Sequence, residues 1–208
     1  MVSSLILFAP GGLIRTGNIQ FTNKLLYNYG VLSETLLEFI IRRRLASGVP
    51  PIKPKKTLEN TPASGEIPPP AENPPPLSKE YPNLAVSKLV PWQLDANRGF
   101  VRGYISSMRY GPISNQHEHW ARVGQRLNAQ RLNAAIGKTK VDMGLQNGKV
   151  LIICGKNDVI VVPKELREDA AMCLGEENFE LREVDAGHDL PVTKSTEIVD
   201  CIWDFWGR

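Results

Sequence analysis

Several features that would define a class of protein are scarce or absent in this sequence. The sequence has three cysteines, Cys154, Cys173 and Cys201. Their number is odd and no pair has Cys-x-x-Cys spacing, which argues against a disulfide framework and against a zinc site. The 25 basic residues exceed the 22 acidic ones by only three, too small an excess to indicate a nucleic-acid partner. No apolar run is long enough to span a bilayer, so no transmembrane segment is expected.

The remaining composition is that of a globular protein. The chain has 208 residues, of which 42% are hydrophobic and 23% charged, enough to build a real core. The apolar start, Val2 to Ala9, lacks the basic region of a signal peptide and is cut off by Pro10-Gly11-Gly12. These features predict a cytoplasmic protein.

Residues 1–14 are interpreted as one strand and a turn. The apolar run Leu5–Ala9 is short, continuous and ended by Pro10 and two glycines. Such a run predicts a strand that is buried on both faces of a parallel sheet.

Residues 15–148 have a different character. Helical spacing predicts a helix over Phe21–Arg44, or two helices divided at Gly30. The apolar face comprises Leu25, Leu26, Tyr29, Leu32, Leu36, Leu37, Ile40 and Ile41. Residues 50–82 are dense in proline, including Pro68-Pro69-Pro70, and are expected to be an exposed, flexible insertion. Weaker helical patterns run from Trp92 to about Ala135.

Residues 149–208 are the most regular part. A buried strand is predicted over Val150–Cys154, then a helix that Pro163 opens and Gly175 ends. A short strand follows over Phe179–Val184, and a last helix from about Lys194, with this apolar stripe: Ile198, Val199, Ile202, Trp203 and Trp206. The alternation of strands and helices predicts the α/β class, with a parallel sheet and crossover helices.

Polar residues follow both of these strands. Asp158 comes shortly after Cys154, and His188 comes shortly after Val184. Catalytic groups gather at the carboxyl ends of parallel strands, so the two side chains are expected to meet. A carboxylate that accepts the imidazole Nδ1 proton leaves the other ring nitrogen free as a general base. Taken singly, Asp158 is more typical of a turn former or helix cap, and His188 of a structural or exposed residue near a turn.

Around these residues the sequence resembles the α/β-hydrolase family. The stretches that carry the resemblance are ICGKNDVIVVP around Asp158, VDAGHDLPV around His188, and the opening LILFAPGGLIR. They are most similar to a fungal-type esterase, lipase or epoxide-hydrolase branch, and they follow that family's order of acid before histidine. The resemblance implies the C-terminal part of such an enzyme: core residues 1–14 and 149–208, and a mostly helical lid over 15–148.

The resemblance also implies a function. Asp158 and His188 would be the catalytic acid and base of a Ser-His-Asp hydrolase that acts on an ester or a similar small apolar substrate, with no metal and no organic cofactor. The family's nucleophile stands in Gly-x-Ser-x-Gly, and no serine here has glycine two residues away on both sides. This chain is therefore expected to lack the nucleophile and the oxyanion hole and to be inactive alone.

The missing half has a structural consequence. In the family's strand order, the strand that resembles Leu5–Phe8 pairs with the nucleophile strand. Without that neighbour it becomes an apolar edge in a sheet of about three strands, which predicts poor stability or self-association. The alternative is a non-catalytic remnant that acts as a binding or interaction module.

Other motifs have less specific interpretations. His117-Glu118-His119 could bind a metal, but its helical surroundings place residues i and i+2 on different faces, and solvated polar residues are the simpler reading. Arg42-Arg43-Arg44 and Lys53-Pro54-Lys55-Lys56 fit a helix end and a solvated linker, or a phosphate or nuclear-localisation patch. The proline runs could bind SH3 or WW domains. Trp92 and Trp120 could line a pocket, although core packing is the commoner use.

Overall fold

The computed structural model describes residues 2–18, 26–27, 31–47, 80–81, 86–136, 145 and 148–207. They fall into two compact units: Met1–Thr16 with Pro112–Arg208, and Gly17–Gly111. Apart from Glu80 and Tyr81, the predicted proline-rich insertion lies outside the described residues, as does the Lys53–Lys56 cluster.

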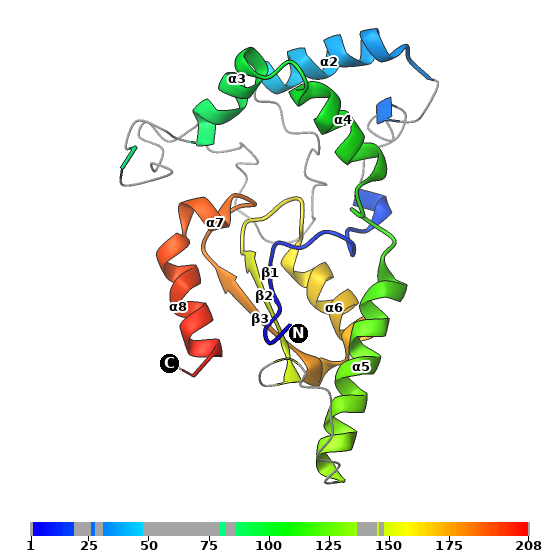
Figure 1. Ribbon diagram of the computed structural model, residues 1–208, viewed down its shortest axis with the longest axis vertical. Helices are drawn as coiled ribbons and strands as arrows, with labels where there is room; N and C mark the ends of the chain where they lie inside the picture. Colours follow the sequence, from blue (N-terminus) through cyan, green and yellow to red (C-terminus); the bar gives the residue numbers. More distant parts are fainter. Residues whose placement is uncertain are drawn as a thin grey trace, which may run out of the picture. The chain divides into compact units, whose positions relative to one another are not determined.

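The first unit is built on a parallel sheet of three strands (Figure 1), which confirms the α/β class. The strands are β1 (Ile6–Phe8), β2 (Val150–Gly155) and β3 (Phe179–Val184), in the order β1-β2-β3. Every residue of the central strand β2 is buried. A continuous apolar run such as Val150–Cys154 suits this place, because a central parallel strand is covered on both faces.

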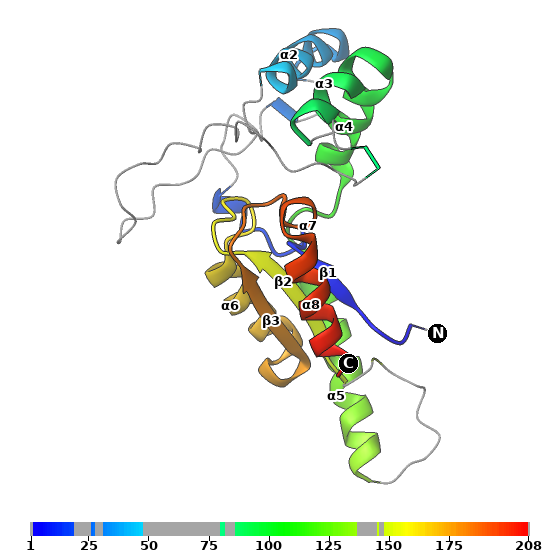
Figure 2. The ribbon, with the colours of Figure 1, turned by 90° about the vertical axis from the view of Figure 1, so that its left-hand side faces the viewer.

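Helices cover both faces of this sheet, and Figure 2 shows α6 (Pro163–Leu174) and α8 (Ser195–Phe205) on opposite sides. Leu151 and Ile153 of β2 pack with Ile198 and Phe205 of α8. The short helix α7 (Leu190–Thr193) precedes α8, and the turn η3 (Glu176–Asn178) joins α6 to β3. The predicted start of α6 at Pro163 and its end before Gly175 are confirmed.

The first strand differs from its prediction. Ile6 and Leu7 are only half-buried and Phe8 is 39% exposed, so burial on both faces was wrong. The reason is position: β1 pairs with β2 alone and forms one edge of the described sheet. Leu5 accepts from the N–H of Leu151 and Ala9 donates to Ile153, so the backbone groups of Ile6 and Phe8 point to the open side of the edge.

The segment after β1 is tied down by a charged contact. Arg15 donates two hydrogen bonds of 2.9 Å to the buried carboxylate of Asp169 on α6, and one of 2.8 Å to Glu168. This paired geometry is the strong form of an arginine–carboxylate contact. The contact holds the segment after β1 against α6. The turn η1 (Thr16–Asn18) follows.

Helix α5 (His117–Ala135) packs closely on α6 within the same unit. It belongs to the stretch that the sequence assigns to a lid, and that assignment stays a prediction. At Gly124 an added Cβ would lie 2.6–2.8 Å from backbone atoms of Cys173 and Leu174. Only glycine allows the two helices to approach so closely.

We therefore expect Gly124→Ala to destabilise the first unit by about 1–3 kcal/mol, because backbone cannot yield as a side chain can. The matched control is Gly103→Ala in helix α4 (Phe100–Tyr110) of the second unit, where nothing lies within 4 Å of the added Cβ. There the better helix propensity of alanine should stabilise by roughly 0.5–1 kcal/mol. Thermal unfolding followed by circular dichroism checks both, and a Gly124→Ala protein as stable as the parent would contradict the packing.

The second unit contains three described helices, α2 (Glu34–Ala46), α3 (Val86–Ala96) and α4 (Phe100–Tyr110). They share one core: Tyr27, Leu37, Ile41, Leu94, Val101 and Ile105. Of the stretch Phe21–Arg44, helix is confirmed at Leu26 and Tyr27 and from Glu34 onward. Ser33 caps the helix at Glu34 by accepting from the N–H of Leu36. Residues 19–25 and 28–30 lie outside the described residues.

Two apolar faces predicted from sequence are confirmed only in part. In α2 the side chains of Leu37 and Ile41 are buried, but Leu36 is 47% exposed. In α8 the buried positions are Ile198 and Phe205, whereas Val199 is 46% exposed. Each helix carries more apolar residues than one face can hold, so the position of the neighbouring elements decides which of them are covered. No helix in the described ranges is long and apolar enough to cross a membrane.

Candidate active site

Two loops leave neighbouring strands at the same end of the sheet. One follows β2 and carries Asp158 (the acid loop); the other follows β3 and carries His188 (the histidine loop). Because β2 and β3 are parallel and in register from Val150–Phe179 to Gly155–Val184, both loops start at the same level. The structure brings the two predicted residues together as the strand order requires.

Asp158 is buried, with 3% of its surface exposed. Its Oδ1 atom accepts hydrogen bonds from the N–H groups of Ile160 at 2.8 Å and Val161 at 2.9 Å. Its Oδ2 atom lies 2.9 Å from Nδ1 of His188. The turn-forming and the histidine-binding readings of Asp158 are therefore both correct, because each carboxylate oxygen serves one of them.

His188 is more open, with 47% of its side chain exposed against none for Asp158. The ring presents Nδ1 to the buried carboxylate of Asp158. This contact suits the tautomer in which Nδ1 carries the ring proton. Nε2 is then left as an acceptor. The hydrogen bond that His188 donates to Asp158 raises the pKa of His188, whereas partial burial lowers it.

This pKa shift predicts a pH dependence of stability. Since the folded pKa of His188 is raised above its ordinary value of 6.5, its contribution is fully present below about pH 6.5 and is lost as the pH rises through the folded pKa. We expect the free energy of unfolding to fall across that window and Asp158→Asn to flatten the fall. Urea unfolding of both proteins at pH 6 and pH 9 measures it, and parallel pH profiles would rule the linkage out.

The two loops are also joined through their backbones. The N–H of Lys156 donates to Val184 at 2.8 Å and that of Asn157 donates to Ala186 at 3.0 Å. At Gly155 an added Cβ would lie 2.3 Å from the carbonyl oxygen of Ala186 and 2.4 Å from that of Gly187. The glycine that the approach requires is thus Gly155, whereas an added Cβ at Gly187 would meet only Asp189 Oδ1, at an ordinary 3.6 Å.

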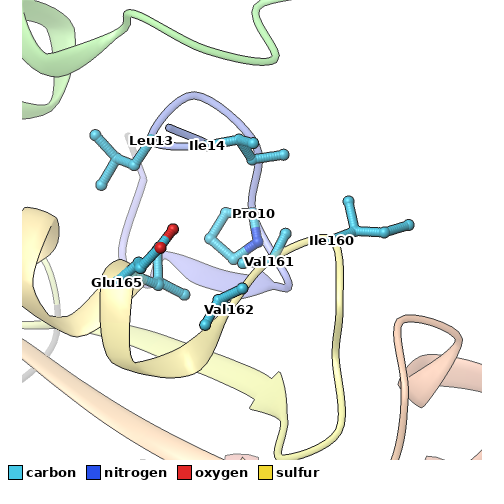
Figure 3. A pocket seen from close by; sticks show the side chains of 8 residues that line it. Pro10, Leu13, Ile14, Ile160, Val161, Val162 and Glu165 are labelled. Carbon is cyan, nitrogen blue, oxygen red and sulfur yellow. The ribbon is translucent and has the colours of Figure 1, made fainter. Parts of the chain in front are cut away.

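A small cavity lies beside the acid loop (Figure 3). Its volume of about 10 Å³ is that of roughly one water molecule, too small for a substrate. Pro10, Leu13 and Ile14 from the segment after β1 face Ile160 and Val161 across it. The segment after β1 therefore supports the loop that holds Asp158.

The other sequence candidates lie elsewhere. His117 and His119 begin helix α5, and no cluster of three metal-binding side chains occurs in the part of the chain described. Cys154 is fully buried in β2, and this burial raises the pKa of its thiol to about 12, in keeping with its reading as a small hydrophobe. Trp92 is 59% exposed, so core packing does not explain it. Arg42 of the arginine cluster pairs with Asp95 at 3.6 Å.

Sequence reasoning missed one polar contact at the site. The Asn157 side chain donates to Asp185 at 3.0 Å, joining the residue before Asp158 to the first residue after β3. The signal was present, since both are polar residues at strand ends, but only the paired strands show that they meet.

No family model, curated protein or solved structure matches the chain.

Proposed function

We propose that Asp158 is the carboxylate and His188 the general base in the triad of a Ser-His-Asp hydrolase that acts on an ester or a similar small apolar substrate. The observation that supports this most is the 2.9 Å contact between a buried carboxylate and the Nδ1 atom of a half-exposed imidazole. In this arrangement one ring nitrogen is held by a buried carboxylate and the other is left as an acceptor, which is what a general base requires.

Each group has a defined role in this proposal. Asp158 holds the tautomer of His188 and stabilises the imidazolium when it forms. Nε2 of His188 takes the proton of a serine hydroxyl as that oxygen attacks the ester carbonyl, and returns the proton to the leaving alcohol. In the second half of the reaction, His188 deprotonates a water that attacks the acyl-serine ester. The acyl group leaves as the acid, and the serine oxygen regains its proton from His188. No metal or organic cofactor enters these steps.

The proposal places the serine on polypeptide outside these 208 residues, because no Gly-x-Ser-x-Gly occurs within them. The open edge of β1 supports this placement, since Ile6 and Phe8 direct backbone groups to a side with no strand in the described sheet. In the α/β-hydrolase family that the sequence resembles, the nucleophile strand pairs there. Residues 15–148 would then be a lid that shapes the substrate pocket, with residues 50–82 as an insertion within it.

The test begins with the transcript. We would map its 5′ end and read the coding sequence upstream of Met1 for a strand, Gly-x-Ser-x-Gly and a helix. The polypeptide that includes such a segment should hydrolyse p-nitrophenyl esters, and His188→Ala should lower kcat by about 10⁴- to 10⁶-fold. His119→Ala, at an exposed histidine of α5, is the matched control and should keep full activity.

The 208-residue chain alone should show little or no turnover. If it hydrolysed aryl esters, and His188→Ala abolished that activity, the serine would lie within this sequence and our placement would be wrong. An active longer enzyme that tolerates His188→Ala would refute the role of His188.

A second function is favoured by the open edge of β1 together with the absence of a nucleophile motif. The chain would then be a non-catalytic interaction module that pairs with a partner strand or with a second copy of itself. An untranslated leader directly before Met1 would favour it. In that case, association measured by analytical ultracentrifugation should be unchanged in His188→Ala.

A further inference from the structure

The two loops of the candidate site are joined at three levels, and the outermost is a side-chain contact. Gly155 lets the acid loop approach the carbonyl groups of Ala186 and Gly187. The N–H group of Lys156 then donates to Val184 at the end of β3, and that of Asn157 donates to Ala186 in the histidine loop. Beyond these, the side chains of Asn157 and Asp185 meet at 3.0 Å, and both residues are exposed.

The place of this contact in the chain is informative. Asn157 directly precedes Asp158, and Asp185 is the first residue after β3, three positions before His188. A bond between these two residues closes a ring that also contains the Asp158–His188 hydrogen bond. Within such a ring, the separation of the two loops sets the distance from the carboxylate to the imidazole.

We propose that the Asn157–Asp185 bond positions His188, by holding the histidine loop against the acid loop so that the contact between Asp158 and Nδ1 stays short. Neither residue touches the imidazole, so both are positioning residues. The inference rests on the proposed function, because a fixed Asp–His distance matters for catalysis only where the pair acts as acid and base.

Variants of the two residues separate this bond from simple electrostatics. Asn157→Ala removes the bond and no charge. Asp185→Asn removes the charge and keeps an oxygen that can accept from Asn157, and Asp185→Ala removes both. The control is Glu118→Ala, which breaks an exposed ion pair with Arg122 on α5.

Two measurements on the 208-residue chain are informative. The backbone N–H at position 157 bonds to Ala186. Its hydrogen exchange should become about fivefold faster in Asn157→Ala and Asp185→Ala, because a net hydrogen bond is lost. It should stay slow in Asp185→Asn and in Glu118→Ala. The His188 pKa, followed by NMR of the ring, should fall in Asn157→Ala, because the contact with Asp158 loosens.

The proposal is overturned if Asn157→Ala leaves both the exchange rate at position 157 and the His188 pKa unchanged. If Asp185→Asn and Asp185→Ala then lower this pKa equally, Asp185 acts through its charge alone. Failure of the proposed function is seen separately: Asp158→Asn would leave the His188 pKa where it is, or the longer enzyme would tolerate His188→Ala, whatever the Asn157 variants do.

Discussion

Replacing Gly155 with alanine is expected to destabilise the first unit by about 2–4 kcal/mol and to separate the two loops of the site. The added Cβ would lie 2.3 and 2.4 Å from two carbonyl oxygens, distances at which the backbone must move. Overpacking of this kind costs about 1–3 kcal/mol, and losing the cross-loop bonds of Lys156 and Asn157 adds to it.

Two readouts check this expectation. Urea unfolding should show the loss of stability, and the pKa of His188 should fall toward its ordinary value, since the histidine loop would move away from Asp158. Gly187→Ala, in the loop after β3, is the control, because its added Cβ meets only Asp189 Oδ1 at an ordinary 3.6 Å. Equal stability of the two variants would mean that the close approach at Gly155 does not constrain the site.

The site was predictable because its determinants are local. The runs Val150–Cys154 and Phe179–Val184 are bounded by glycine or polar residues, and Pro163 and Gly175 delimit the helix between them. A strand–helix–strand unit of this length is parallel, and parallel neighbours bring their carboxyl ends together. The meeting of Asp158 and His188 therefore follows from the order of the strands and the helix between them.

Burial was less predictable because it depends on neighbours that the sequence does not name. Phe8 is apolar and stands in a strand, yet it is 39% exposed, since β1 is an edge of the described sheet. Asn178 is polar and fully buried, because its amide donates to Leu174 at 2.6 Å and to Asn128 of α5 at 2.7 Å. No periodic pattern shows that a helix 50 residues away supplies the second partner.

The pairing of Arg15 with Asp169 has the same origin. The two residues are 154 positions apart and carry no motif, but the parallel order of β1 and β2 places the end of one beside the helix that follows the other. Long-range polar contacts of this kind follow from topology, so they become visible only after the strand order is known.

Substitution of Asp158 is expected to separate its two roles. In Asp158→Ala the N–H groups of Ile160 and Val161 lose their acceptor, and we expect a loss of roughly 2–4 kcal/mol, because each such group left unpaired in a buried place costs about 1–3 kcal/mol. In Asp158→Asn the amide oxygen can still accept both bonds. The loss should then be only about 1 kcal/mol.

The asparagine variant should nevertheless remove the function of the pair. Its NH₂ group would face Nδ1 of His188 and donate to it, so the ring proton would move to Nε2, the atom that must act as a base. The pKa of His188 should lose its upward shift, and in the longer enzyme kcat should fall by about 10⁴-fold. Ring nitrogen chemical shifts report the tautomer directly. If Asp158→Asn kept the proton on Nδ1 and full activity, the carboxylate would serve the turn at Ile160 and Val161 alone, and the histidine would need another explanation.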